Sequence, residues 1–163
     1  MSKNKKIDLF GFIVFGVLLL SIVMAIVGIC IDWTAGKIES IIGNSESISF
    51  TLSELAKNDT DSFTVMQTFA YITLALTGAA TITFVVSKFL NLGFFKFIVV
   101  VVCVLLIVSA IITIATTFSF CGNYKIDGGL VGTKCVPAAG AWLLTIFSVI
   151  GGLAGIVGAL KKQ

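Results

Sequence analysis

The run LFGFIVFGVLLLSIVMAIVGICI occupies residues 9–31 and contains no Asp, Glu, Lys, Arg or His. Three further runs share this property, and they cover residues 63–87, 97–120 and 137–160. A helix needs about 20 apolar residues to cross the roughly 30 Å hydrocarbon core of a bilayer. Because that core holds no water, each backbone N–H and C=O must be paired within the protein, which favours helices. The sequence therefore predicts an all-α membrane protein with a bundle of four transmembrane helices.

The composition supports one membrane domain without a separate soluble part. Hydrophobic residues make up 58% of the 163 residues, and charged residues only 12%. These proportions are typical of polytopic membrane proteins and not of soluble domains. We expect residues 1–163 to form a single tetraspan domain, in which residues 32–62 and 121–136 form two loops on the same side of the membrane.

The chain lacks the groups that most catalytic and ligand-binding sites require. It has no histidine, so imidazole bases and histidine metal sites are excluded. No acid or base within the four runs could form a proton relay or an ion site. All eleven basic residues are lysine, which cannot supply the guanidinium fork used in nucleic-acid recognition. We therefore expect a protein that is not an enzyme and has no cofactor, no metal and no nucleic-acid partner.

The lysines predict how the chain is oriented. Seven of the eleven lie before the first run, between the second and third runs, or after the fourth. By the positive-inside rule, both termini and the short link at residues 88–96 are cytoplasmic, and the two loops face outward. We expect an integral protein of the plasma membrane. Loop 32–62 has six acids and two lysines, a net charge of −4, and is the larger and more acidic outer surface.

Both outer loops carry signals of a small β-sheet. Residues 47–53 (SISFTLS) alternate polar and apolar side chains, which is typical of a half-buried strand. An earlier strand would use Ile38, Ile41 and Ile42, with a turn at residues 43–44. In the second loop, residues 127–129 (DGG) predict a turn. We expect a small extracellular sheet formed by both loops, with irregular loops as the alternative.

Loop 32–62 also contains a glycosylation sequon at residues 58–60 (NDT). If the protein is made in a eukaryote, Asn58 is a candidate for a glycan. The alternative is a sequon present by chance, because the site lies only a few residues before the second apolar run.

Two of the four cysteines predict a disulfide. Cys121 and Cys135 bracket the second loop on the expected oxidising side of the membrane. Closing a loop of this size contributes roughly 3 kcal/mol in the chain-entropy model. We expect the other two, Cys30 and Cys103, to act as small apolar packing residues.

Small residues in the apolar runs predict close helix packing. The fourth run carries Gly151, Gly155 and Gly158 at spacings that let two helix backbones approach closely. We expect this packing within the bundle, with packing against a second subunit as the alternative. In the second run, Thr73, Thr77 and Thr81 recur every four residues and indicate either hydrogen-bonded helix contacts or a polar pore stripe.

The order of parts, together with three local features, resembles the claudin and peripheral-myelin-protein superfamily of tetraspans. Trp33 closely follows the first run, residues 116–123 (TTFSFCGN) end the third, and residues 140–142 (GAW) open the fourth. The resemblance implies a four-helix bundle with an outer sheet and a role in contacts between membranes or membrane proteins. Loop 32–62 has no cysteine and no Gly-Leu-Trp, so the resemblance concerns the architecture.

We therefore interpret the chain as a non-catalytic claudin-like tetraspan that acts in cell-surface adhesion, membrane organisation or barrier formation. Its partners would be the lipid bilayer and either further copies of itself, as a homo-oligomer, or a larger membrane protein. Contacts would use the outer sheet, held by Trp33, Ile48, Phe50 and Leu52.

The alternative function is a pore-forming or auxiliary subunit of an ion channel or transporter. In an oligomer, the acids of the first loop could form a vestibule that attracts cations. A solvated acidic surface is the simpler interpretation. The acids concerned are Glu39, Glu46, Glu54, Asp59 and Asp61.

Overall fold

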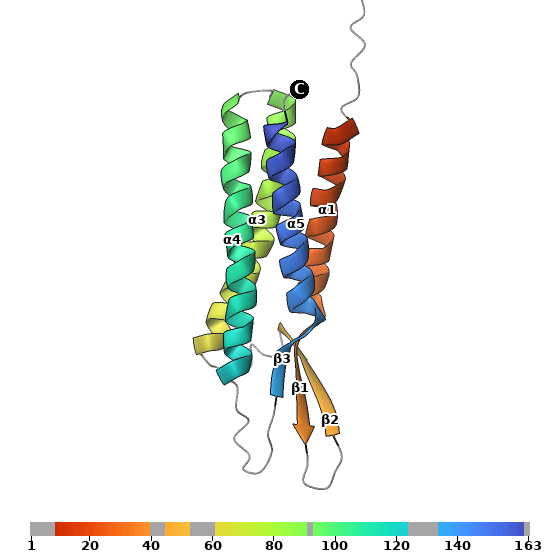
Figure 1. Cartoon of the computed structure of the whole chain (residues 1–163), viewed down its shortest axis with the longest axis vertical. Helices are drawn as coiled ribbons and strands as arrows, with labels where there is room; N and C mark the ends of the chain where they lie inside the picture. Colours follow the sequence, from red (N-terminus) through yellow and green to blue (C-terminus); the bar gives the residue numbers. More distant parts are fainter. Residues whose placement is uncertain (1–8, 40–44, 53–60, 91–92, 124–133, 162–163) are drawn as a thin grey trace, which may run out of the picture.

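The computed structural model describes residues 9–39, 45–52, 61–90, 93–123 and 134–161. Figure 1 shows a bundle of long helices with a small sheet at one end. In chain order, the helices and strands are α1 (Leu9–Cys30), β1 (Asp32–Glu39), β2 (Ser45–Thr51), α3 (Asp61–Leu90), α4 (Gly93–Asn123), β3 (Lys134–Pro137) and α5 (Ala139–Leu160).

The four apolar runs form four helices that are long and apolar enough to cross a membrane, as predicted. Helices α3 and α4 are longer than the runs that predicted them, with 30 and 31 residues. At 1.5 Å per residue each is about 45 Å long. The apolar run covers only the part of a helix that is suited to the hydrocarbon core of a membrane. The backbone hydrogen bonds of the helix continue into the polar residues on either side. Cys121 therefore lies in α4, not in the second loop as expected.

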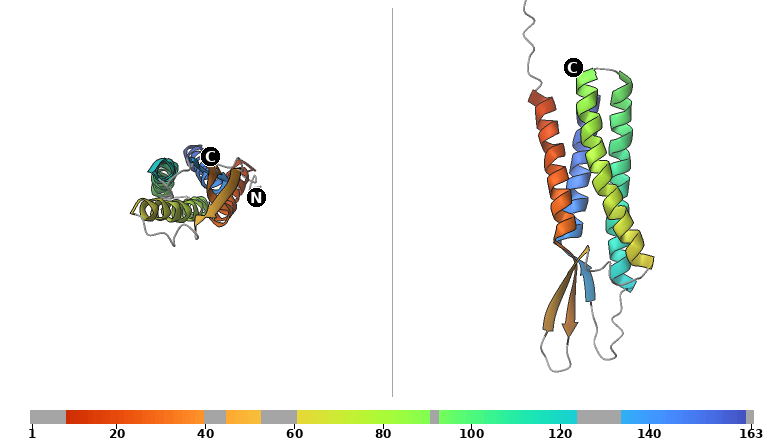
Figure 2. Two further views of the ribbon diagram at one scale, coloured as in Figure 1. Left: turned by 90° about the horizontal axis from the view of Figure 1, so that it is seen from below. Right: turned by 180° about the vertical axis from the view of Figure 1, so that it is seen from behind.

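The four helices form a bundle in which α5 contacts the other three. Helix α1 packs on α5, α5 on α4, α4 on α3, and α3 closes the arrangement against α1. Figure 2 shows this arrangement from the end of the bundle and from behind. One end of the bundle contains the first residues of α1 and α4 and the last residues of α3 and α5. The sheet lies at the opposite end. We call these the lysine end, which carries Lys88, Lys96 and Lys161, and the sheet end.

The sheet has three antiparallel strands in the order β2-β1-β3, so both loops contribute to it, as predicted. Its strands begin earlier than expected: β1 starts at Asp32 and β2 at Ser45, and β2 ends at Thr51. The central strand β1 has little apolar alternation of its own, and backbone ladders to β2 and β3 hold it on both sides. The expected turns at residues 43–44 and 127–129 lie outside the described residues.

Two apolar clusters fill the bundle, one near each end. The sheet-end cluster includes Trp33, Leu52, Met66, Phe120 and Leu144. The lysine-end cluster includes Val14, Leu18, Phe84, Val99 and Leu106.

Buried hydroxyl groups lie between the two clusters. Thr73 Oγ1 lies 2.7 Å from Ser109 Oγ and 2.9 Å from Thr113 Oγ1, so it links α3 to α4. Thr77 Oγ1 donates to Thr73 O at 2.8 Å and lies 3.4 Å from Ser148 Oγ of α5. These side chains are fully buried. The threonine stripe of α3 therefore makes hydrogen bonds between helices in the bundle interior.

The glycines of α5 lie against the other three helices of the bundle. A Cβ on Gly151 would meet Ser21 of α1, one on Gly155 would meet Cys103 of α4, and one on Gly158 would meet Phe84 of α3. The structure thus places all three glycines at contacts within one chain.

The two remaining cysteines differ in their surroundings. Cys103 is buried against α5, whereas Cys30 is exposed on α1. The expectation that Cys30 packs inside the protein is wrong. Gly28 faces the bundle interior, and a residue two positions later on a helix points away from that side.

Candidate functional site at the sheet end

A β-bulge directs Trp33 into the end of the bundle. In the ladder between β1 and β2, Asp32 pairs with Thr51 and Thr34 pairs with Phe50, so Trp33 is the extra residue. A bulge re-aims the side chain of the extra residue and bends the strand. Because of this change, Trp33 and Thr34 are both buried, although neighbours in a regular strand face opposite sides.

Trp33 forms the centre of the contact between sheet and bundle. Its side chain has 0% exposure and belongs to one cluster with Leu52 from beyond β2, Met66 of α3 and Phe120 of α4. Its carbonyl oxygen accepts a hydrogen bond from the Ala138 N–H at 2.9 Å, which ties it to the start of α5. The Trp33 Nε1 atom has no acceptor within the part of the chain that the structure describes. Apolar packing is therefore what holds this side chain.

A cysteine pair joins the sheet to α4 close to Trp33. The Sγ atoms of Cys121, in the last turns of α4, and Cys135, in β3, lie 2.7 Å apart. A hydrogen bond with the Cys121 thiol lowers the pKa of the Cys135 thiol, and burial acts in the opposite sense. A lowered pKa favours the thiolate, which is the reactive form in disulfide formation. The expected disulfide thus involves two side chains that the structure brings together.

We predict that oxidation links these two residues in cells that secrete through an oxidising compartment. The oxidised protein should then migrate faster in a non-reducing gel than the reduced protein. Cys121→Ser and Cys135→Ser should each abolish this shift, whereas Cys30→Ser should leave it unchanged. Absence of any shift in the unmodified protein would contradict the disulfide.

The hairpin of β1 and β2 projects away from the bundle. Strand β1 leaves the end of α1 and has eight residues, so its far end is about 23 Å from α1 at 3.3 Å per residue. At that far end, Glu39 pairs with Ser45 next to the pair of Ile38 and Glu46. The far end of the described hairpin therefore carries two acids, Glu39 and Glu46, at a distance from the helices.

The structure brings together only part of the residues expected in the first loop. Trp33 and Leu52 are buried in one cluster, with half-buried Phe50 packed against it. Ile48 of β2 pairs with Gly36 of β1. Of the acids, Glu39 and Glu46 are neighbours on the hairpin, and Asp61 begins α3. Glu54, Asn58 and Asp59 lie outside the described residues.

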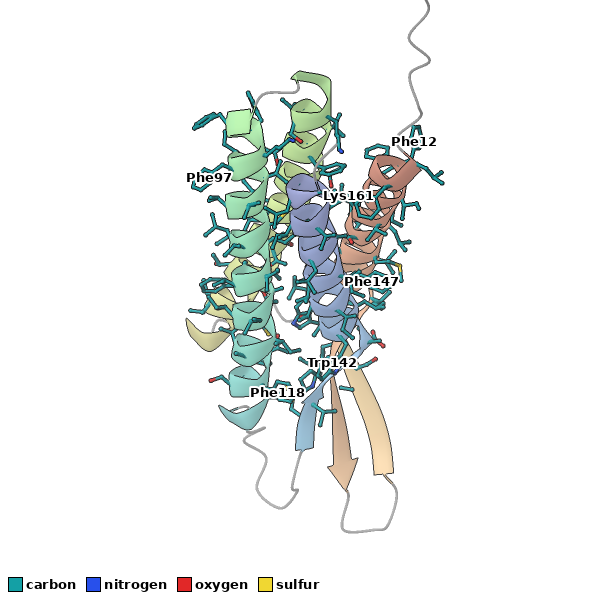
Figure 3. The ribbon with its side chains drawn as sticks, turned by 45° about the horizontal axis from the view of Figure 1, so that its top comes forward. Phe12, Phe97, Phe118, Trp142, Phe147 and Lys161 are labelled. Carbon is teal, nitrogen blue, oxygen red and sulfur yellow. The ribbon has the colours of Figure 1, made fainter. Side chains whose placement is uncertain are left out.

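Exposed aromatic rings flank the sheet end. Phe118 of α4 and Trp142 of α5 form an edge-to-face pair with ring centroids 6.0 Å apart (Figure 3). Their side chains are 51% and 43% exposed. Tryptophan is enriched where a transmembrane helix meets the membrane–water interface. Such a ring pair, next to the sheet on the bundle side, is typical of the end of a membrane-spanning helix.

The sequence did not predict which helix residues pack against the sheet. Met66 and Phe120 are fully or almost fully buried against Trp33. Phe120 follows Thr113 and Thr117 at helical spacing, so the periodicity of α4 could have revealed it. Met66 could not be predicted in this way. Its burial depends on Trp33 turning into the bundle, and nothing in the sequence shows the β-bulge that turns Trp33.

The described side chains at the sheet end form an apolar cluster that includes a cysteine of the Cys121–Cys135 pair. Within the described residues, no group of three or more His, Cys, Asp or Glu side chains could hold a metal ion. The hydroxyl groups of the bundle interior are covered by Trp33 and Phe120 at one end, and by Leu18 and Phe84 at the other. The described residues of one chain therefore provide no continuous polar lining through the bundle.

Fold and site together define the class: a protein with four helices able to span a membrane and a small sheet anchored at one end of the bundle. No family model matches the sequence, and no curated protein matches it.

Proposed function

We propose that the chain is a non-catalytic, claudin-like tetraspan of the plasma membrane, with both termini in the cytoplasm and the sheet outside the cell. In this role it supports adhesion, membrane organisation or barrier formation through contacts of the sheet and of the helix surfaces. The observation that carries the proposal is the anchoring of the sheet by Trp33. A sheet fixed to the bundle holds a contact surface in one orientation, which lowers the entropy cost of binding.

Surface composition also supports a role in contacts. The lipid-facing sides of the helices are apolar, and the charged residues of the described sheet lie on the projecting hairpin and on β3. The hairpin projects from the bundle and is the element that we propose for recognising a partner. The partner is a second copy of the chain or a larger membrane protein.

Cross-linking from the sheet tests this proposal. Ser49 is exposed on β2, so Ser49→Cys in a Cys30→Ser background provides one reactive thiol on the hairpin. We expect a bismaleimide to link this thiol to a second copy or to a partner in native membranes. The matched control is Ile82→Cys in the same background, which places the thiol on the exposed side of α3 within the membrane.

Gentle extraction followed by native mass spectrometry identifies the linked species. A homo-oligomer or a stoichiometric complex with a larger protein is expected. A monomer in native mass spectra, together with no cross-link from residue 49, would contradict the proposed contact role.

A pore or auxiliary channel subunit is the second candidate. The presence of Glu39 and Glu46 in consecutive pairs of the β1–β2 ladder favours it, because an oligomer would bring the acids of several hairpins around one axis. If the oligomer conducts, replacing the acids of residues 39–61 by Gln or Asn should reduce its preference for cations. Unchanged selectivity would exclude a vestibule formed by these acids.

A further inference from the structure

The two ends of the described bundle carry opposite charge. Lys88 near the end of α3, Lys96 near the start of α4 and Lys161 directly after α5 lie at the lysine end of the bundle. All four acids within the described ranges lie in the sheet or at the first residue of α3, at the sheet end, where Lys37 and Lys134 offset two of them and leave two net negative charges. The lysine end is therefore a cationic surface formed by three different helices.

Two of these lysines are held over aromatic rings of the bundle. Lys161 Nζ lies 3.7 Å from the centroid of the Phe10 ring, so the cation connects the end of α5 with the start of α1. Lys88 Nζ lies 5.7 Å from the centroid of the Phe84 ring, which belongs to the buried core. Cation–π contacts of this kind restrict the ammonium groups to the end of the bundle.

A long apolar surface begins directly beside the third lysine. Lys96 lies between Phe94 and Phe97, whose side chains are 71% and 67% exposed. Figure 3 shows Phe97 and Phe12 at the same end of the molecule as Lys161. Further exposed residues continue along α4 toward the sheet end at helical spacing: Val101, Val104, Leu105, Val108 and Ile111.

This combination matches one kind of ligand. A cationic end that continues into an exposed apolar surface complements a molecule with an anionic headgroup and long hydrocarbon chains. A free phosphate ion would use the lysines but leave the surface of α4 uncovered. We propose that the lysine end binds anionic phospholipids, with headgroup phosphates distributed over Lys88, Lys96 and Lys161 and, for a lipid at Lys96, an acyl chain along α4.

The inference rests on the membrane-spanning arrangement proposed above and not on the contact role of the sheet. In this proposal the lysines select anionic lipids, in addition to setting the orientation of the chain in the membrane. A polybasic segment near a membrane surface gains about fivefold in binding to anionic lipid per lysine.

The test compares lipid binding by the full chain and two charge-matched variants in mild detergent. Native mass spectrometry measures how strongly each protein retains phosphatidylserine and phosphatidylcholine. The first variant, K88Q/K96Q/K161Q, removes three lysines from the lysine end. The control, K37Q/K125Q/K134Q, removes three lysines from the loop side. We expect the first variant to lose on the order of 100-fold in affinity for phosphatidylserine, and the control to keep it.

Lys96→Gln alone provides a second variant in case the triple variant does not fold. It should weaken phosphatidylserine binding about fivefold and leave phosphatidylcholine binding unchanged. Equal loss in both triple variants, equal binding of the two lipids by the parent protein, or full displacement by millimolar inorganic phosphate would each overturn the proposal. Because this readout does not involve residue 49, a failed cross-link and a failed lipid preference remain distinguishable.

Discussion

Replacing Trp33 by Ala should lower the free energy of unfolding by about 3–5 kcal/mol, which is the usual cost of truncating a buried aromatic side chain. The side chain is completely buried in a cluster to which all four helices contribute, so its removal leaves a cavity that rigid neighbours fill poorly. We expect the loss in unfolding titrations of the detergent-solubilised protein. Protease sensitivity of the hairpin should rise at the same time, because Trp33 fixes the sheet to the bundle.

Trp33→Phe is the matched control for this prediction. It keeps most of the ring volume and removes the indole N–H, which has no acceptor among the described residues. A buried donor without a partner costs about 1–3 kcal/mol, so its removal offsets the smaller buried area. We expect a change of less than about 1 kcal/mol in either direction. A comparable loss in both variants would show that packing of the ring is not what stabilises this junction.

The sequence predicted the helices because lipid imposes one strong rule on composition. Each of the four uncharged runs became a helix, since a buried backbone must satisfy its own hydrogen bonds. The same rule did not predict where α4 ends. Cys121 lies past the apolar run but still within the helix, because the end of a helix depends on local hydrogen bonds and not on hydropathy.

The details of the candidate site depend on strand register, which the sequence expresses only weakly. Alternation at residues 47–53 predicted a strand near β2, but the bulge at Trp33 depends on how β1 pairs with that strand. The position of Glu39 and Glu46 in consecutive pairs of the ladder depends on the same register. The meeting of Cys121 and Cys135 was predictable, because both residues lie near the ends of one short loop.

Replacing Gly140 by Ala should be among the most destabilising single changes in the helices. Gly140 lies where α5 passes α1, and a Cβ there would collide with the carbonyl oxygen of Gly28 and lie 2.8 Å from that of Asp32. Both atoms belong to the backbone, so a side-chain rotation cannot relieve the contact. We expect a loss of about 3 kcal/mol in the free energy of unfolding, at the upper end of the usual cost of overpacking.

Gly78→Ala provides the control that separates this clash from a general effect of glycine. Gly78 also lies inside a long helix, but a Cβ there would meet nothing within 4 Å. Alanine is favoured over glycine in helices by about 1 kcal/mol, so this variant should be as stable as the parent or more so. The two variants should thus differ by about 4 kcal/mol, the sum of the clash at α1 and the gain at the open site. Equal stability would mean that α1 and α5 separate without cost, and the close backbone contact would then not be what positions the sheet at the end of the bundle.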